Sequence, residues 1–281
     1  MPWEIYRYYN ITPAYPSQVL NSFNKGGSAY GYSSVLSLFD MYGFALVVLT
    51  AGDPMARGEL PDVIISALAP QLEEEQRRQA RQRYVKSYID ATQSNATFSS
   101  NMSMAGNSSS TVVKMNITLD AGPGLIIQNL TRGDSDILAS FPKIYEATFG
   151  KLIGLPLTLW PVIRMYPADI EERTTNADGR DVIKEDWRIK WDPVTDYNKW
   201  NGTEMVGTGI SSDVCSSWLD ADWIAWGGQS IDRVVFVKDA QNGDILGVEL
   251  PWLRADLTVA ASNAKTVTRT PRRRVKIRGR Y

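Results

Sequence analysis

Apolar and polar residues alternate at several places from residue 113 onward, which is the pattern of half-buried β-strands. The segments that we predict as strands are residues 113–119, 125–130, 155–166, 187–191, 233–238, 245–250, 257–261 and 275–277. Pro161 interrupts one of them, so we expect an edge or bulged strand there. Residues 241–244 (Gln-Asn-Gly-Asp) separate two others and predict a hairpin turn.

Helical patterns are fewer. Residues 61–69 predict a short helix, and residues 70–93 predict a longer one with Glu73, Glu74 and Glu75 in its first turn, where acids suit the helix dipole. The spacing also predicts Glu73–Arg77 and Glu74–Arg78 ion pairs. A further short helix is expected over residues 140–149, capped by Ser140 and ended by Gly150.

Residues 35–51 form the longest apolar run, although Asp40 and Gly43 interrupt it. We interpret the run as a buried core helix. Because it approaches the ~20 residues that cross a bilayer, an anchor or a membrane-contacting helix remains the alternative.

The order of these patterns predicts an α+β, β-rich fold with a sandwich or jelly-roll-like sheet domain. Residues 1–30 mix aromatic residues and prolines without a period, so we expect an extended arm. The polar stretch from residue 94 to 110 provides the internal boundary. The chain thus divides into an arm with helices (1–93), a β-rich glycosylated body (94–264) and a basic tail (265–281).

Composition excludes several kinds of chemistry. The chain has no histidine, which rules out a Ser-His-Asp triad, a Cys-His pair and a His-ligated zinc site. The single cysteine, Cys215, cannot form an intrachain disulfide, and we interpret it as a buried apolar residue. The sequence indicates no catalytic residue, metal site or cofactor.

Seven of the thirteen asparagines lie in Asn-X-Ser/Thr sequons, where glycans attach in secreted proteins. They are Asn10, Asn95, Asn101, Asn107, Asn116, Asn129 and Asn201. Asn116 falls on the polar face of a predicted strand, where a glycan could attach. The sequons favour an extracellular or virion location, whereas residues 1–30 lack the apolar core of a signal peptide.

The C-terminal tail carries eight of the 30 basic residues and none of the 31 acidic ones. Its candidate binding residues are Arg272, Arg273, Arg274, Lys276, Arg278 and Arg280. In a strand, four of these cations would share one face, which suits a nucleic-acid phosphate backbone. Docking on an acidic protein surface, of this subunit or of a neighbour, is the alternative.

Without histidine, catalysis would fall to carboxylates. Asp220 and Asp222 lie between Trp218 and Trp223, and aromatic residues with paired acids are typical of sugar chemistry. A turn with Asp caps and buried Trp side chains is the simpler interpretation. A cation site that includes Asp213 lacks EF-hand spacing.

We therefore expect a structural subunit of an extracellular assembly, most specifically a virion capsid or coat protein, that forms a homo-oligomer or a multi-subunit assembly. Nucleic acid could bind through the tail, and residues 35–51 could contact a membrane. The alternatives are a secreted or membrane-anchored ectodomain that binds carbohydrate or another ligand, and a carboxylate-based glycoside hydrolase.

Overall fold

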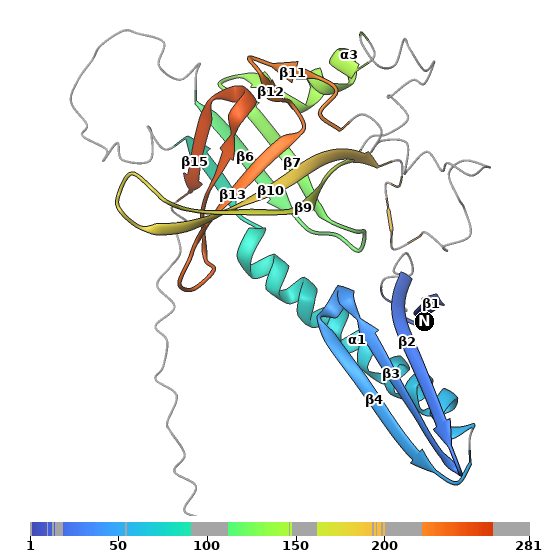
Figure 1. The fold of residues 1–281 in the computed structure, drawn as a ribbon. Coiled ribbons are helices and arrows are strands. Elements are labelled where there is room, and N and C mark those ends of the chain that lie inside the picture. The colour runs from blue at the N-terminus through green and yellow to red at the C-terminus, as the bar shows by residue number, and fades with distance from the viewer. Residues whose placement is uncertain are drawn as a thin grey trace, which may run out of the picture.

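The computed structural model describes residues 2–9, 11–12, 14, 19–53, 55–90, 112–145, 147, 162–192, 194, 196–197, 199 and 221–260. They form two β-sheet regions, which one long helix joins (Figure 1). The first region is a four-stranded antiparallel sheet in the order β1-β2-β3-β4. Its elements are β1 (Glu4–Tyr9), β2 (Val19–Ala29), β3 (Tyr32–Phe39), the 3-10 turn η1 (Asp40–Tyr42) and β4 (Phe44–Ala51).

The N-terminal sheet corrects two predictions. The expected arm over residues 1–30 contains β1 and β2, which are paired strands. The apolar run 35–51 is a β-hairpin and not a helix, because η1 and the left-handed Gly43 (φ 65°) reverse the chain in its middle. No helix among the described residues is long and apolar enough to cross a membrane.

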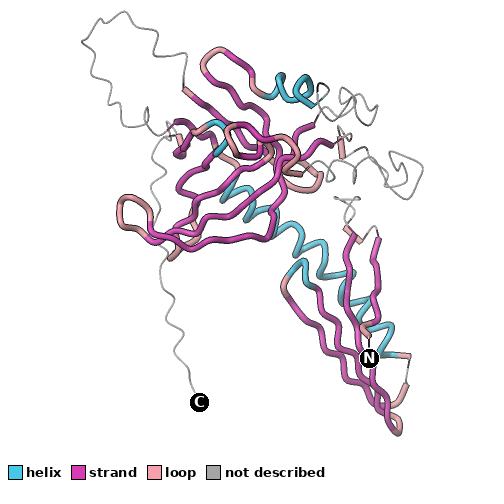
Figure 2. Tube along the Cα trace, turned by 45° about the horizontal axis from the view of Figure 1, so that its top comes forward, coloured by secondary structure: helices cyan, strands magenta, loops and turns pink. Residues whose placement is uncertain are grey.

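Helix α1 (Ala56–Tyr84) replaces the two helices expected over 61–69 and 70–93. Pro70 lies inside it without ending it. Buried positions recur mainly at four-residue intervals, so they follow one face of the helix; they are Pro61, Ile65, Ala69, Glu73, Arg77 and Tyr84. The first half of this face packs on the N-terminal sheet and the second half reaches the other region (Figure 2).

The second region is a closed antiparallel barrel. Its eight strands run in the order β6-β5-β15-β14-β13-β10-β9-β7, and β6 pairs with β7 to close the ring. The strands are β5 (Ser87–Asp90), β6 (Val113–Thr118), β7 (Leu125–Arg132), β9 (Val162–Thr175), β10 (Asp181–Asp192), β13 (Arg233–Asp239), β14 (Ile245–Leu250) and β15 (Ala255–Val259). The fold is β-rich, as predicted, but the sheet closes on itself instead of forming a sandwich or jelly roll.

Alternation in the sequence identified most barrel strands. The hairpin of β13 and β14 pairs as expected, and the inward residues of β6 and β10 are buried in the barrel core. Residues 87–90 were predicted as helix, but they form β5 and place Tyr88 in that core. Predicted strands over 155–161 and 275–277 lie outside the described residues.

Short elements cover one end of the barrel. They are β8 (Ser135–Asp136), η3 (Leu138–Ser140), α3 (Phe141–Tyr145), β11 (Ala225–Trp226), β12 (Gln229–Ser230) and η6 (Pro251–Leu253). Phe141 from α3 packs edge-on against Trp191 of β10 and beside Trp252 of η6, with ring centroids 5.7 and 5.5 Å apart. These aromatic contacts fix α3 onto the barrel core.

Candidate functional site

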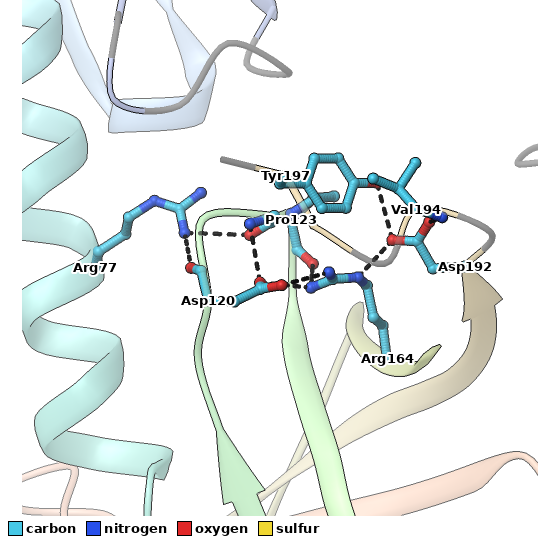
Figure 3. Close-up of polar contacts among 8 residues, drawn as sticks. Arg77, Asp120, Pro123, Arg164, Asp192, Val194 and Tyr197 are labelled. Atoms are coloured by element: carbon cyan, nitrogen blue, oxygen red, sulfur yellow. Dashed lines mark hydrogen bonds and ion pairs between the residues drawn. The ribbon is translucent and has the colours of Figure 1, made fainter. Parts of the chain in front are cut away.

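The most elaborate polar arrangement among the described residues lies where α1 meets the turn between β6 and β7 (Figure 3). Arg77 of α1 is buried; its Nε donates to Glu73 Oε1 at 2.5 Å. Its Nη1 donates to the carbonyl oxygens of Asp120 (2.8 Å) and Gly122 (3.1 Å) in the turn. Tyr42 of η1 donates its hydroxyl to Glu73 Oε2 at 3.2 Å. This set of contacts therefore ties both regions together.

Arg164 of β9 is the centre of the adjoining ionic cluster and is fully buried. Its two terminal nitrogens bind both carboxylate oxygens of Asp120 at 2.8 and 2.7 Å, and Nη1 also donates to the Pro123 carbonyl at 3.1 Å. Its Nε donates to Asp192 at the end of β10. Tyr197 donates to the same carboxylate at 2.8 Å and lays its ring 4.8 Å from the guanidinium carbon.

These contacts shift the ionisation of the cluster. Burial alone would raise the pKa of Asp120, but the hydrogen bonds and charge of Arg164 outweigh it and hold that pKa below its ordinary value. Burial, with the charge of Asp192 beside it, raises the pKa of Tyr197. At neutral pH the cluster is therefore an ionised Asp120–Arg164 pair beside a neutral phenol.

Close packing leaves no room for a side chain at two positions of the β6–β7 turn. A Cβ on Gly122 would collide with the side chains of Tyr197 and Arg164. Gly124 has φ +69°, and a Cβ added to it would lie only 2.5 Å from the Met165 carbonyl oxygen. The turn therefore needs glycine at both positions, which explains Gly-Pro-Gly at residues 122–124.

The chemistry of these contacts suits a structural role. We call the contacts of Arg77 and Arg164 around the β6–β7 turn the joint. Each cation in it pairs with carboxylates or carbonyls, and a satisfied buried polar network of this kind rigidifies a structure. No group of three or more potential metal-binding side chains occurs in the described part of the chain. We therefore assign the cluster to holding α1 against the barrel mouth.

Asp222, one of the candidate acids, lies outside this joint. It has a left-handed backbone (φ 60°) and accepts a 2.8 Å bond from Arg188 of β10. Arg188 also lies 3.5 Å from Asp232, which is buried against Lys190. The acid is thus an exposed partner of a barrel ion pair. Four other residues singled out in the sequence lie outside the described residues, namely Asp213, Cys215, Trp218 and Asp220.

The predicted binding residues are mostly outside the described ranges as well. This holds for the whole basic tail and for Asn10, Asn95, Asn101, Asn107 and Asn201. Asn116 and Asn129 are described and stand directly opposite each other on β6 and β7. Both are only partly exposed, so two glycans there would compete for the same space. Glycan occupancy and the binding role of the tail stay predictions.

The sequence predicted the Glu73–Arg77 pair but not the contacts of Arg164, although a signal for them exists. Arg164 interrupts the apolar segment Val162–Met165, and a cation buried in a strand requires acidic partners. Asp120 and Asp192 each lie just beyond a predicted strand end. Their common partner depends on the closure of the barrel, which alternation does not reveal.

A serine and a lysine lie three positions apart at the start of α3. Residues Ser140-Phe141-Pro142-Lys143 have the Ser-x-x-Lys spacing of one class of serine nucleophile. Ser140 ends η3, is exposed, and its Oγ donates to the Asp136 carbonyl at 3.3 Å. Lys143 is exposed on the five-residue helix α3. Nothing described beside them supplies an enclosed pocket, so the spacing alone does not mark an active site.

Comparison with known proteins defines the class. The family "Beta-lactamase-like-like, C-terminal domain" matches residues 76–261, which cover the end of α1 and the barrel. The chain therefore belongs to this family. It is 32% identical over 258 residues to a "Beta-lactamase-like protein" of Arthroderma benhamiae and 25% identical over 268 residues to the "Probable hydrolase clz13" of Cochliobolus lunatus. No solved structure gave a significant match.

Coverage is unequal in these alignments. They include 91% and 94% of this chain but 40% and 38% of the two relatives. The chain thus spans about two fifths of the length of the curated relatives it matches. Both alignments extend beyond the family match and take in most of the N-terminal sheet.

These relationships correct the expected function. A virion capsid or coat subunit is wrong, because the family and both relatives are β-lactamase-like or hydrolase proteins. The same family and relatives contradict the alternatives, a carbohydrate-binding ectodomain and a carboxylate glycosidase. The error arose from using sequons and a basic tail, which are common surface features, as indicators of a class. Extracellular location and self-assembly stay untested predictions.

Proposed function

We propose that this chain works as the barrel part of a β-lactamase-like hydrolase, where it supports a separate acyl-hydrolysing part. The observation that carries the proposal is the family match over residues 76–261, to a family described as a C-terminal domain. The relatives are more than twice as long as the matched region, which leaves room in them for catalytic machinery. In this arrangement the nucleophile is a serine outside the barrel.

The outer face of the N-terminal sheet supports the proposal. Because side chains alternate across a strand, this face collects apolar residues from all four strands; it comprises Ile5, Phe23, Leu36, Leu38, Val47 and Leu49, and we call it the outer apolar face. Val47 and Leu49 are 59% and 77% exposed. Lys25 and Ser34 lie on the same face, but exposed apolar side chains gathered in this way favour an interaction site.

The opposite face of the same sheet, beneath α1, is mixed, because buried polar residues lie there beside the apolar Leu20, Phe39 and Val48. Ser22, Asn24, Ser33 and Ser37 are buried there beneath α1. Asn24 is satisfied by the Ser22 side chain at 2.8 Å, so the polar interior is hydrogen-bonded. The inner face is thus already packed against α1, whereas the outer face exposes apolar side chains, which favours a partner that covers the outside, and we assign this partner to the acyl-hydrolysing part.

A chimera tests the proposal. In the Arthroderma benhamiae relative, the region that matches this chain is replaced by this chain, and hydrolysis of p-nitrophenyl butyrate and nitrocefin is measured. We expect the chimera to fold and to hydrolyse whichever substrate the unmodified relative accepts. Val47→Lys with Leu49→Lys should lower that activity, whereas Ile170→Lys, which charges an exposed apolar position on the barrel, should not.

The purified chain provides the opposing measurement. We expect no labelling by a fluorophosphonate probe and no ester turnover. Labelling that disappears in Ser140→Ala but persists in the matched variant Ser135→Ala would place the nucleophile in this chain and overturn the proposal. A folded chimera without activity would contradict it equally.

A further inference from the structure

Strand β4 forms one edge of the N-terminal sheet, and β3 is its only strand partner in the described part of the chain. Its eight residues, Phe44–Ala51, include no charged residue, no proline and no glycine. Natural proteins usually protect a long edge strand with such residues, because its unpaired backbone groups otherwise accept a further strand. The strand at the opposite edge, β1, carries Glu4 and Arg7. The two edges therefore differ, and β4 is the one suited to pairing.

The backbone of β4 offers hydrogen bonds along this edge. Gly52 N donates to Gly31 O at 2.8 Å, just beyond the paired residues of β3 and β4. Bonding alternates from residue to residue in an antiparallel ladder, so the N–H and C=O groups of Ala45, Val47 and Leu49 point away from β3. The side chains of Val47 and Leu49 are also 59% and 77% exposed. A strand that pairs here satisfies the backbone groups and adds cross-strand contacts to the side chains.

One flank of α1 adds apolar surface beside β4. The helix lies along one face of the N-terminal sheet and contacts β3 and β4 (Figure 1). On one flank, Asp62 accepts a hydrogen bond from Tyr8 of β1 at 3.1 Å. Because a step of two residues turns a helix by about 200°, Leu60, Ile64 and Leu68 lie on the flank turned away from β1 and toward β4. Leu60 and Leu68 are 43% and 42% exposed, so apolar side chains stand beside the unpaired edge.

A second copy of the chain matches this edge in both layers. Antiparallel pairing of β4 with itself follows a two-fold axis perpendicular to the sheet, which puts Val47 opposite Val47 of the second copy and Ala45 opposite its Leu49. No like charges meet in the paired strands, because β4 has none. The same axis places α1 of both copies on one side of the joined sheet, so the two apolar flanks face each other. One symmetric contact thus covers both the edge and the flanks.

We propose that the chain forms a two-fold homodimer in which the β4 strands pair antiparallel about Val47 and the apolar flanks of α1 pack beside them. The two N-terminal sheets then become one continuous sheet, and the outer apolar faces of both copies lie on its other side, open to a partner. The homodimer therefore goes beyond the proposed function and does not rest on it.

Sedimentation velocity of the purified chain over a range of concentrations measures the association. We expect a reversible monomer–dimer equilibrium. Leu68→Lys puts a lysine on each apolar flank, so two like charges meet in the contact and the dissociation constant should rise at least about 10-fold. Ser66→Lys adds the same charge to an exposed position outside this flank and should leave the constant unchanged. Leu60→Lys repeats the test at a second exposed position if Leu68→Lys unfolds.

Cysteine cross-linking tests the strand pairing itself. In the Cys215→Ser background, Val47→Cys faces its own copy across the axis, where hydrogen-bonded residues have Cα atoms about 5.5 Å apart, a separation that a disulfide spans. Oxidation with diamide should therefore give a covalent dimer. Arg7→Cys is the matched control, because Arg7 is exposed on the opposite edge strand of the same sheet, and it should not cross-link.

A chain that stays monomeric at every concentration overturns the proposal. A dimer that Leu68→Lys and Ser66→Lys weaken equally overturns it too, as does a dimer in which Val47→Cys cross-links no faster than Arg7→Cys, because either result places the contact elsewhere. None of these readouts measures hydrolysis, so failure of the homodimer is distinguishable from failure of the proposed function.

Discussion

The barrel and the N-terminal sheet use the same antiparallel pairing but distribute their residues in opposite ways. The barrel turns its apolar residues inward, around a core that includes Met115, Ile189 and Phe236. The N-terminal sheet buries only a small cluster against α1, namely Leu20, Phe39, Ile65 and Ala69. It places serines beside this cluster and much of its apolar surface outside. The barrel thus buries its own apolar residues, whereas the sheet exposes an apolar face that is suited to contact with a partner.

The largest expected effect comes from breaking the buried ionic cluster of the barrel. Arg164→Met leaves Asp120 and Asp192 without their shared cation, and removal of one partner from a buried ion pair costs about 3–5 kcal/mol. Urea unfolding measures the loss. Arg57→Met is the matched control in the N-terminal region, where the guanidinium bonds Ser28 in an exposed position, and its cost should stay below about 1 kcal/mol. Equal losses would contradict the difference between the two regions.

A cavity in the small cluster should separate the two regions. Ile65→Ala removes a fully buried side chain beneath the N-terminal sheet, and such deletions cost about 2–5 kcal/mol. We expect faster hydrogen exchange in β1 to β4 and unchanged protection of the barrel strands. Simultaneous loss of protection in both regions would instead reveal one cooperative unit.

Acid should weaken the barrel through Asp120. Because its pKa is lowered in the folded chain, its stabilising effect is complete above the ordinary value of 3.8 and is lost as pH falls through the folded pKa. Asp120→Asn should lower stability at neutral pH by about 1.5–3 kcal/mol and flatten the acid limb. Thermal unfolding, followed from neutral pH down to roughly pH 2, provides the measurement. An unchanged acid limb would show that other carboxylates govern it.

Substitution on the outer apolar face should have the smallest effect on the chain alone. Val47→Ser with Leu49→Ser changes exposed positions, and surface changes usually stay within about 0.5 kcal/mol each. Chemical denaturation and light scattering measure stability and association. A loss above about 1 kcal/mol for the pair would mean that this face is already packed within the chain.

Local pattern predicted the barrel strands but not the closed sheet. Alternation identified β6, β10 and the β13–β14 hairpin, because each has one face in the core. Closure depends on pairing between β6 and β7 together with contacts far apart in the sequence, such as β5 with β15. Those pairings have no local signature.

The N-terminal sheet and α1 show why the elements in this part of the chain were predicted incorrectly. Residues 35–51 are apolar on both faces, since one face packs on α1 and the other is the outer apolar face, so alternation is absent and the run resembles a buried helix. Pro70 was interpreted as a helix start, yet α1 continues through it because packing on both regions outweighs the lost hydrogen bond. Of the joint, only the Glu73–Arg77 pair was predicted; Arg78 instead pairs with Glu75.

Hydrogen–deuterium exchange across β1 to β4 tests the central claim most directly. The chain alone is compared with the same chain inside the chimera with the Arthroderma benhamiae relative. We predict that β4 and its neighbours gain protection in the chimera, while the barrel strands β13 and β14 exchange at the same rate in both. Equal exchange of β1 to β4 in the two proteins would show that no hydrolase part covers the outer apolar face, and would contradict the account.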